Sequence, residues 1–305
     1  MNRHLTVSAI ARPQTSRPAR LPWSLAACVL AGGALVCAGQ ARAQDSDWAA
    51  GDAEQAKPLW ELGVAGIGAS QLAYPGAASS VRRGLVLPYV IYRGKRWFAG
   101  EGGAGLRAFK SRDWSVDLGV AAAFAAPSDA VEARQGLPDL GTMVELGPRL
   151  KWRLGEDRHG GRWQFNLPVR AVLDLDHGLA YKGVVAEPTI SLSHRWPQAW
   201  RTSVGLGWVM GNRALADTFY TVTPAQATAQ RPAYAAQAGW VSWRLSLRAG
   251  KQVNPDLRVF GFVRTESVQG AANASSPLVQ RRVGTSVGLG FVYTFARAEE
   301  LVSGR

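Results

Sequence analysis

Few residues in this chain could carry acid–base or nucleophilic chemistry. Beyond residue 43 the histidines are His159, His177 and His194. The first two lie in polar, glycine-containing segments, and we interpret both as solvated loop residues. His194 follows Ser193, but neighbouring side chains on a strand point to opposite faces, so a serine–histidine dyad is not expected there. We therefore predict no catalytic residue.

Metal and thiol chemistry have equally weak support. Asp174 and Asp176 share a face and could bind a cation with His177, but a lone acidic pair is more often a charge partner. We predict no metal site and no cofactor. The cysteines, Cys28 and Cys37, both lie in the expected export signal, so the processed protein would have no disulfide, thiolate ligand or cysteine nucleophile.

The N-terminus has the features of a secretory signal peptide. Within residues 1–43 a basic stretch precedes an apolar run at 21–39 and the small-residue cleavage site Ala41-Arg42-Ala43, so the mature chain would begin at Gln44. A transmembrane anchor is the less favoured alternative, because the apolar run contains two glycines and no stop-transfer pattern follows. Lipoprotein processing at Cys28 is also disfavoured, because it would leave an apolar stretch on the mature protein.

The charge balance is basic but dispersed. The formal net charge is +13, and removing the five basic residues before Asp45 leaves 30 basic against 22 acidic residues, or +8. No Lys/Arg block or nucleic-acid motif is present, so an anionic envelope surface such as lipopolysaccharide or peptidoglycan is the favoured neighbour. No linker divides the chain, so we expect a short periplasmic segment (44–59), one domain (60–295) and a C-terminal tail (296–305).

Alternating apolar and polar residues, the β-strand period, dominate the chain from Trp60 onward. In one segment Val241, Trp243, Leu245 and Leu247 alternate with Ser242, Arg244, Ser246 and Arg248. The stronger segments of this kind are 114–124, 144–154, 163–176, 200–210, 241–248 and 283–295. Weaker segments are 60–70, 84–92, 96–106, 183–194, 217–222 and 257–267. We predict an all-β fold, an antiparallel transmembrane β-barrel of about twelve strands with ten as the alternative.

Turn lengths partly contradict this assignment. Short periplasmic turns should alternate with longer outer loops, yet the expected connections at 93–95 and 110–113 are both short and successive. Strand register is therefore not fixed at this stage.

A soluble β-barrel or sandwich is the main alternative, because it shows the same alternation with the apolar row turned inward. Ten or more long strands would enclose too wide a space for these apolar rows to fill. Aromatic residues also gather at strand ends, as in the interfacial girdle of a membrane barrel. The expected girdle is Trp60, Trp97, Trp114, Trp163, Trp200, Trp243, Tyr293 and Phe295.

The polar rows would then line the lumen. Mixed charges facing a narrow interior favour cross-strand ion pairs that fill it over a conducting pore, and an open lumen would favour anions because arginine is in excess. The expected lumenal row is Glu145, Arg149, Lys151, Arg153, Arg170, Asp174, Glu187, Arg201, Arg244, Arg248, Arg264 and Glu266.

Several short motifs, in this order and spacing, resemble the MipA/OmpV family of outer-membrane proteins. They are Tyr74-Pro75-Gly76, Leu87-Pro88-Tyr89, a Gly-Thr-x-x-Glu-x-Gly core from Gly141, and the closing strand Gly288–Phe295. This strand ends in paired aromatics, as in the C-terminal signal of outer-membrane proteins, although a tail follows it. The resemblance implies an outer-membrane barrel, and the name-giving member is described as a scaffold joining a lytic transglycosylase to a peptidoglycan synthase. It supplies no set of binding residues.

The sequence thus favours a non-catalytic scaffold for peptidoglycan-remodelling enzymes in the outer membrane. Its partners would be outer-membrane lipid or lipopolysaccharide and those two enzymes, and not nucleic acid. A small passive, anion-leaning channel is the second hypothesis. An outer-membrane lipid-modifying enzyme is the third.

Overall fold

The computed structural model describes residues 57–94, 97–100, 103–123 and 131–302. The expected signal peptide and its cleavage site lie outside these residues, as does nearly all of the expected periplasmic segment 44–59. Among the helices within the described ranges, none has the length and apolar character that a membrane crossing requires.

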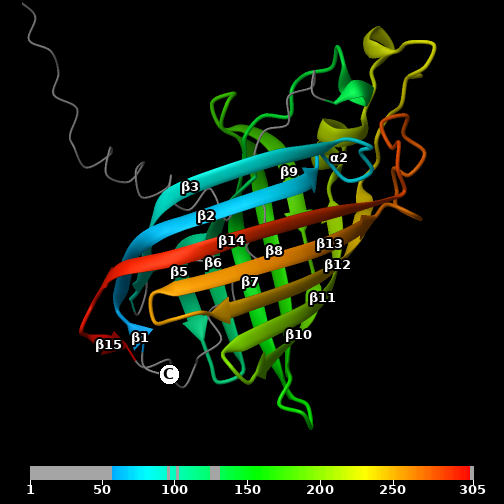
Figure 1. Ribbon diagram of the computed structural model, residues 1–305. Helices are drawn as coiled ribbons and strands as arrows, with labels where there is room; N and C mark the ends of the chain where they lie inside the picture. Colours follow the sequence, from blue (N-terminus) through cyan, green and yellow to red (C-terminus); the bar gives the residue numbers. More distant parts are fainter. Residues whose placement is uncertain (1–56, 95–96, 101–102, 124–130, 303–305) are drawn as a thin grey trace, which may run out of the picture.

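One antiparallel sheet forms almost the whole structure (Figure 1). Its strands are β2 (Trp60–Leu72), β3 (Ser80–Arg93), β4 (Trp97–Gly100), β5 (Gly103–Lys110), β6 (Trp114–Ala123), β7 (Met143–Glu156), β8 (Arg162–Asp174), β9 (Ala180–Ala186), β10 (Thr189–Trp196), β11 (Trp200–Gly211), β12 (Gly239–Gln252), β13 (Leu257–Ser267) and β14 (Val283–Arg297). Each pairs with its sequence neighbours, except that β9 and β10 do not pair with each other, and β14 pairs with β2. The pairing therefore closes into a barrel.

Twelve strand positions surround this barrel. β9 and β10 lie end to end between β8 and β11, since both pair with β8 and with β11. Glu187 and Pro188 separate them, and the missing proline N–H explains the interruption of the ladder. The narrowest contact in the wall is between β3 and β4, which pair only at Tyr92 and Arg93. The prediction of an antiparallel barrel of about twelve strands is confirmed.

Side-chain alternation sets the two faces of the wall. On β14, Leu289 is 74% exposed whereas Ser286 and Val292 on the opposite row are buried. The exposed rows of the other strands are likewise rich in large apolar residues. In a closed barrel the exposed face is the outside, so the apolar rows point outward, as a lipid-facing surface requires.

Two segments differ from the expected strands. Where one strand was expected at 96–106, the structure has the two strands β4 and β5, which pair with each other, with Gly100 paired to Gly103. The glycine-rich Gly100-Glu101-Gly102-Gly103 is a turn signal that the continuing alternation masked. Because the chain reverses direction once more between β4 and β5, the two short connections expected at 93–95 and 110–113 lie at the same end of the barrel. They therefore no longer conflict with the alternation of short turns and longer loops.

The second difference is the expected short strand at 217–222. It is replaced by helix α2 (Arg213–Tyr220), whose N-cap Asn212 accepts a hydrogen bond from Leu215 N at 3.1 Å. Leu215, Ala216 and Tyr220 are buried, and their helical spacing favours a helix over a strand.

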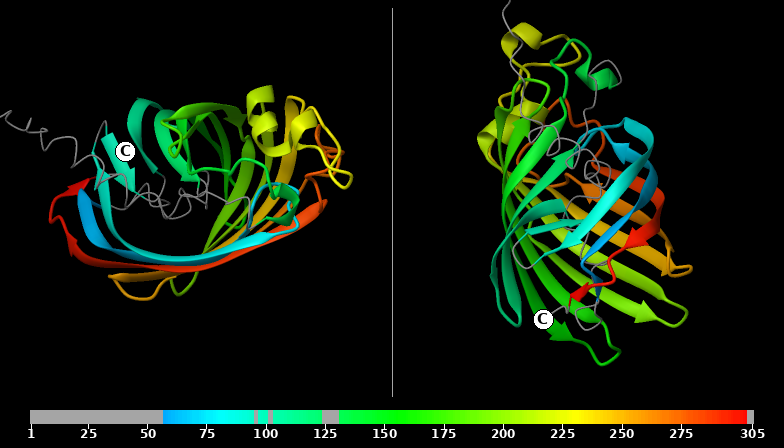
Figure 2. Two further views of the ribbon diagram at one scale, coloured as in Figure 1. Left: turned by 90° about the horizontal axis from the view of Figure 1, so that it is seen from above. Right: turned by 90° about the vertical axis from the view of Figure 1, so that its left-hand side faces the viewer.

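The two ends of the barrel differ. Strands at one end are joined by turns of a few residues, and the pair β1 (Lys57–Pro58) and β15 (Leu301–Val302) brings both ends of the described chain together there. At the other end lie the longer loops, with α2 and the short helices η4 (Glu132–Arg134) and η5 (Pro224–Gln226) (Figures 1 and 2). Short turns and chain termini mark the periplasmic end of an outer-membrane barrel.

Candidate functional site

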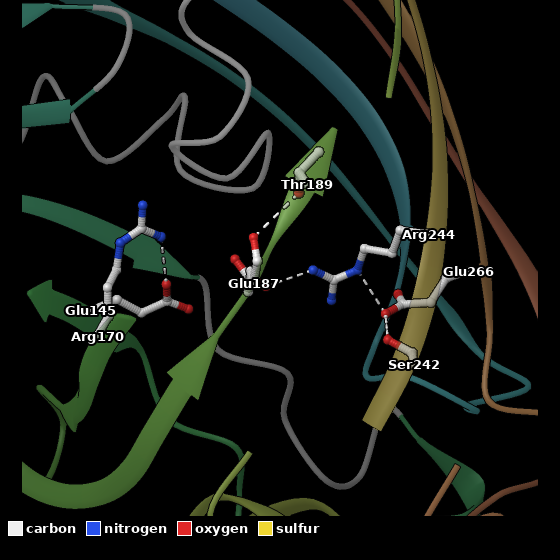
Figure 3. A network of polar contacts seen from close by, with 7 residues as sticks. All are labelled: Glu145, Arg170, Glu187, Thr189, Ser242, Arg244 and Glu266. Carbon is white, nitrogen blue, oxygen red and sulfur yellow. Dashed lines mark hydrogen bonds and ion pairs between the residues drawn. The ribbon is translucent and has the colours of Figure 1, made fainter. Parts of the chain in front are cut away.

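A network of polar contacts inside the barrel centres on Arg244 of β12 (Figure 3). Its Nη1 lies 2.7 Å from Glu187 Oε1 at the β9–β10 junction, and its Nε lies 2.8 Å from Glu266 Oε1 on β13. Ser242 Oγ donates to the same glutamate oxygen. Arg244 pairs in register with Gly207 of β11, and its guanidinium reaches Glu187 beyond that strand. One arginine therefore connects three strand positions, β9–β10, β12 and β13.

Similar pairs continue around the wall on β6, β7 and β8. Arg170 Nη1 lies 3.1 Å from Glu145 Oε2, with both side chains buried. Asp117 Oδ2 lies 3.4 Å from both Arg149 Nη2 and Lys151 Nζ. We call this set, from β6 to β13, the ion-pair belt. Its members are Asp117, Glu145, Arg149, Lys151, Arg170, Glu187, Arg244 and Glu266.

The acidic pair with a nearby histidine lies at the outer rim of β8. Asp174 Oδ2 is 2.9 Å from His177 Nδ1 and 3.2 Å from Lys182 Nζ. Asp176 instead accepts a hydrogen bond from Thr142 N at 2.7 Å, so the two aspartates do not converge on one point. Within the described ranges, no group of three or more acidic, histidine or cysteine side chains could hold a metal ion.

The remaining histidines lie apart from any serine partner. Ser193 pairs with Arg162 and Ser203, and His194 with Thr202, on alternate faces of β10. Among the residues that the structure describes, no serine or threonine hydroxyl forms a hydrogen bond with a histidine ring.

The other members of the expected lumenal row also lie on inward-facing positions of their strands. Arg201, Arg248 and Arg264 are half-buried, whereas Arg153 lies exposed near the periplasmic end of β7. Residues that the sequence reasoning left out are Asp117, Lys182, Ser242 and Arg258. Strand parity alone would have found Arg258, which shares its face with Arg264 and Glu266.

An apolar wall lines the interior on β13, β14 and β3. Phe262 lies over Gly288 and Phe260 over Gly290, because a Cβ atom at either glycine would overlap the facing ring. The apolar wall comprises Tyr89, Ile91, Phe260, Phe262 and Val292. The lumen therefore has a charged side and an apolar side, whereas the sequence predicted polar rows throughout.

The largest apolar cluster lies at the outer mouth, where four loops pack together. Its loop members include Tyr74, Leu137, Leu215, Tyr220 and Leu278. Inward-facing strand residues Met143, Val172, Val185, Val209 and Val241 complete it. Val241 was expected in the lipid-facing row with Trp243, but a register shift opposite Val209 and Met210 turns it inward. We call this cluster and its loops the outer cap.

Hydrogen bonds to loop carbonyls fasten the outer cap. Tyr74 donates its hydroxyl to Leu278 O at 2.8 Å, and Tyr220 to Pro75 O at 2.9 Å. Arg134 of η4 donates to Phe219 O at 3.2 Å, and its guanidinium lies 5.8 Å from the centre of the Tyr74 ring. Burial raises the pKa of Tyr74 to about 12, with Arg134 opposing the shift. Burial also lowers the pKa of Arg134.

The expected aromatic girdle lies mostly at the periplasmic end of the outer surface. Trp60, Trp114, Trp163 and Trp200 begin their strands there and are exposed, as are Tyr293 and Phe295 near the end of β14. Trp243 lies at the opposite end, paired in register with Trp208. Trp97 begins β4, and its side chain falls outside the described part of the structure.

Solved structures with a similar arrangement include a bacterial polysaccharide outer membrane secretin (10% identity, TM-score 0.39, 79% of this chain and 100% of that one). Others are Pseudomonas putida OprB (10% identity, TM-score 0.37, 83% and 96%) and outer membrane phospholipase A from Escherichia coli (10% identity, TM-score 0.33, 86% and 97%). No curated protein matches the chain. The sequence profile of the MltA-interacting protein MipA family matches residues 62–295. Because this match spans the whole barrel, the chain belongs to the MipA family and is an outer-membrane β-barrel protein.

Proposed function

We propose that this protein is a non-catalytic scaffold that holds peptidoglycan-remodelling enzymes at the periplasmic face of the outer membrane. The observation that carries the proposal is the inner wall, whose buried charges pair across strands, together with the four loops packed at the outer mouth. A barrel of this kind acts as an anchor rather than a conduit. The family name refers to interaction with MltA, a lytic transglycosylase, which supports an enzyme of that class as a partner.

The periplasmic turns supply a preformed docking surface in this proposal. In the turn between β7 and β8, Asp157 Oδ1 accepts hydrogen bonds from the N–H groups of His159 and Gly161, each at 2.8 Å. These bonds lower the pKa of Asp157, with the Gly161 bond the larger cause. The carboxylate therefore stays charged and keeps the turn ordered under mildly acidic conditions.

The test is direct binding between purified components. The barrel in lipid nanodiscs would be titrated with a purified MltA-type lytic transglycosylase and, separately, with a peptidoglycan synthase. Arg158→Glu, in the exposed β7–β8 turn, should weaken binding. Arg213→Glu, on α2 at the opposite end, is the matched control and should not. Absence of binding by the unaltered barrel, or equal loss in both variants, would exclude docking at the periplasmic end.

A passive channel is the second candidate, favoured by the excess of inward-facing arginine. In planar bilayers it would give reproducible, anion-selective conductance steps that shrink in the Arg248→Ser variant. A silent bilayer with correctly folded protein counts against it.

A further inference from the structure

The outer ends of β2, β3, β13 and β14 carry arginines without carboxylates. Residues 70–84 and 267–284, which include the β2–β3 and β13–β14 loops, contain four arginines and no aspartate or glutamate. The two loops lie against each other, since the backbone N–H groups of Gln280 and Arg281 donate to Gly76 O at 2.9 and 3.0 Å. This side of the outer end therefore carries positive charge only.

Three of these arginines, Arg82, Arg281 and Arg282, have exposed side chains. In the described part of the structure, no ion pair or hydrogen bond links these side chains to another residue. The exposed Arg162 at the periplasmic end, by contrast, pairs with Glu156 at 2.9 Å. An anionic ligand can therefore meet the three arginines without displacing a carboxylate.

Arg82 lies at the outer edge of the lipid-facing surface. It pairs with Ser70 of β2, which pairs with the exposed Val287 of β14, so Arg82 belongs to the outward row. It is ten residues from Tyr92, whose exposed side chain lies near the periplasmic end of the same strand. With a rise of about 3.3 Å per residue and a tilt of about 45°, Arg82 stands about 23 Å above Tyr92. The lipid-facing band of such a barrel is about 25 Å tall, so Arg82 lies at the level of the outer-leaflet headgroups.

A recess in the outward surface lies next to Arg82, where β14, β2 and β3 run side by side (Figure 1). Gly84 of β3 pairs with Gly68 of β2, which pairs with Leu289 of β14, so all three residues share the outward face. A Cβ atom added at either glycine would meet no described atom within 4 Å. The Leu289 side chain lies instead over Gly261 of β13, where an added Cβ atom would be 2.6 Å from Leu289 Cδ2. We call the surface over Gly68 and Gly84 the outer notch.

Apolar side chains border the outer notch on the side away from Arg82. Val86, the next outward residue of β3 after Gly84, is 60% exposed, and the Phe291 ring covers Gly66 of β2. The notch thus has an apolar border toward the bilayer centre and a cation toward the headgroups. This order of groups matches an anionic amphiphile, whose charge and apolar chain meet the same two regions of the membrane.

We propose that the outer notch and the three arginines form a binding site for a phosphorylated glycolipid of the outer leaflet. The Arg82 guanidinium donates hydrogen bonds to a phosphate, and one acyl chain lies over Gly68 and Gly84. Arg281 and Arg282 meet a second anionic group of the same headgroup above the membrane. Guanidinium groups suit this role because they bind phosphate through two parallel, charge-assisted hydrogen bonds. The proposal rests on the outer-membrane location of the barrel and is independent of the scaffold function.

Native mass spectrometry of the full exported chain in detergent tests the role of charge. The probes are bisphosphorylated lipid A, the same glycolipid without phosphates, and inorganic phosphate alone. The parent should bind the phosphorylated glycolipid, and Arg82→Gln should lower the affinity about tenfold, as expected for one lost charge-assisted hydrogen bond. The matched control is Arg213→Gln, an exposed arginine on α2, which should bind like the parent. High salt should weaken binding by the parent.

Filling the outer notch tests the place of the acyl chain. Gly68→Leu should weaken binding of the phosphorylated glycolipid, and Gly84→Leu is the second variant if Gly68→Leu does not fold. The matched control is Ala171→Leu on the outward row of β8, which should bind like the parent.

Four results would overturn the proposal. They are equal binding of the glycolipids with and without phosphates, equal losses in Arg82→Gln and Arg213→Gln, unchanged affinity in the folded leucine variants of the notch, and displacement of the glycolipid by inorganic phosphate. The last result would show that the arginines recognise free phosphate and not a lipid.

Discussion

Removing the guanidinium of Arg244 should destabilise the barrel, because it leaves two buried glutamates without the cation that they share. In the Arg244→Met variant, Glu187 and Glu266 keep their positions but lose the cation between them, and their side chains are only 1% and 10% exposed. Deleting one partner of a buried ion pair costs about 3–5 kcal/mol, because it leaves uncompensated charge away from water. Ser242 still donates to Glu266, so we expect the lower half of that range.

The assay is urea unfolding in lipid vesicles, followed by tryptophan fluorescence. The matched control is Arg213→Met, because Arg213 is 70% exposed and its Nε lies 3.9 Å from Asp217. Exposed ion pairs contribute about 0–1 kcal/mol, so this variant should unfold like the parent.

A compensating variant separates lost charge pairing from lost packing. Combining Arg244→Met with Glu187→Gln and Glu266→Gln removes the buried charges, and most of the lost stability should return. If Arg244→Met alone costs no more than Arg213→Met, the belt is open to water and the argument from buried, paired charges fails. If the triple variant is as unstable as the single one, the loss comes from packing and not from charge.

Three further changes test the outside, the cap and the wall. Leu289→Arg should lower the free energy of unfolding in lipid by about 2–4 kcal/mol, as for arginine at the bilayer midplane. The control Leu301→Arg on β15 should be near neutral. Equal effects of the two variants in urea unfolding would place the exposed rows in water. The folded-state pKa of Tyr74 is raised to about 12, so its neutral hydroxyl stabilises the fold. This contribution to the free energy of unfolding, up to about 2–3 kcal/mol, is complete below about pH 10 and is lost as the pH rises through about 12. Hydrogen exchange of the outer cap should show this alkaline loss of stability, and the loss should be absent in the Tyr74→Phe variant. If Tyr74→Phe shows the same loss at alkaline pH as the parent, Tyr74 is not its cause. Gly63→Ala should lower the free energy of unfolding by about 1–3 kcal/mol, because its Cβ would overlap Tyr293 O and the Tyr89 ring. Gly68→Ala has open space around its Cβ and should leave the stability unchanged. A parent-like Tm for Gly63→Ala would refute the close packing.

The strands were predictable because lipid and lumen impose opposite chemistry on alternate residues. The separation of β4 from β5 was not recognised, because the apolar–polar alternation of the sequence continues nearly in step from one strand to the next. Helix α2 was missed because Leu215, Ala216 and Tyr220 sit in a long loop, where a few apolar residues fit a short strand as well as a helix turn.

The inward position of most belt residues followed from parity, but their partners did not. Arg244 reaches Glu187 across β11, beyond its register partner Gly207, and the register that brings them together is not visible in one sequence. The apolar wall was missed for a related reason. The alternation marks two faces, but it does not reveal that Phe260 and Phe262 face the lumen above glycines of β14.

The distribution of contacts favours the periplasmic end as the working end. Opening the outer cap would break buried hydrogen bonds such as those of Tyr74 and Tyr220, each contributing about 1 kcal/mol, and would expose its apolar cluster to water. The periplasmic turns are already exposed and ordered by their own hydrogen bonds, as at Asp157. A partner that binds there meets a preformed surface and requires no rearrangement of the barrel. The affinity of such a partner for the barrel should therefore be the same whether the outer cap is intact or loosened by Arg134→Met. A partner that binds only the loosened variant would place the binding end at the outer mouth instead.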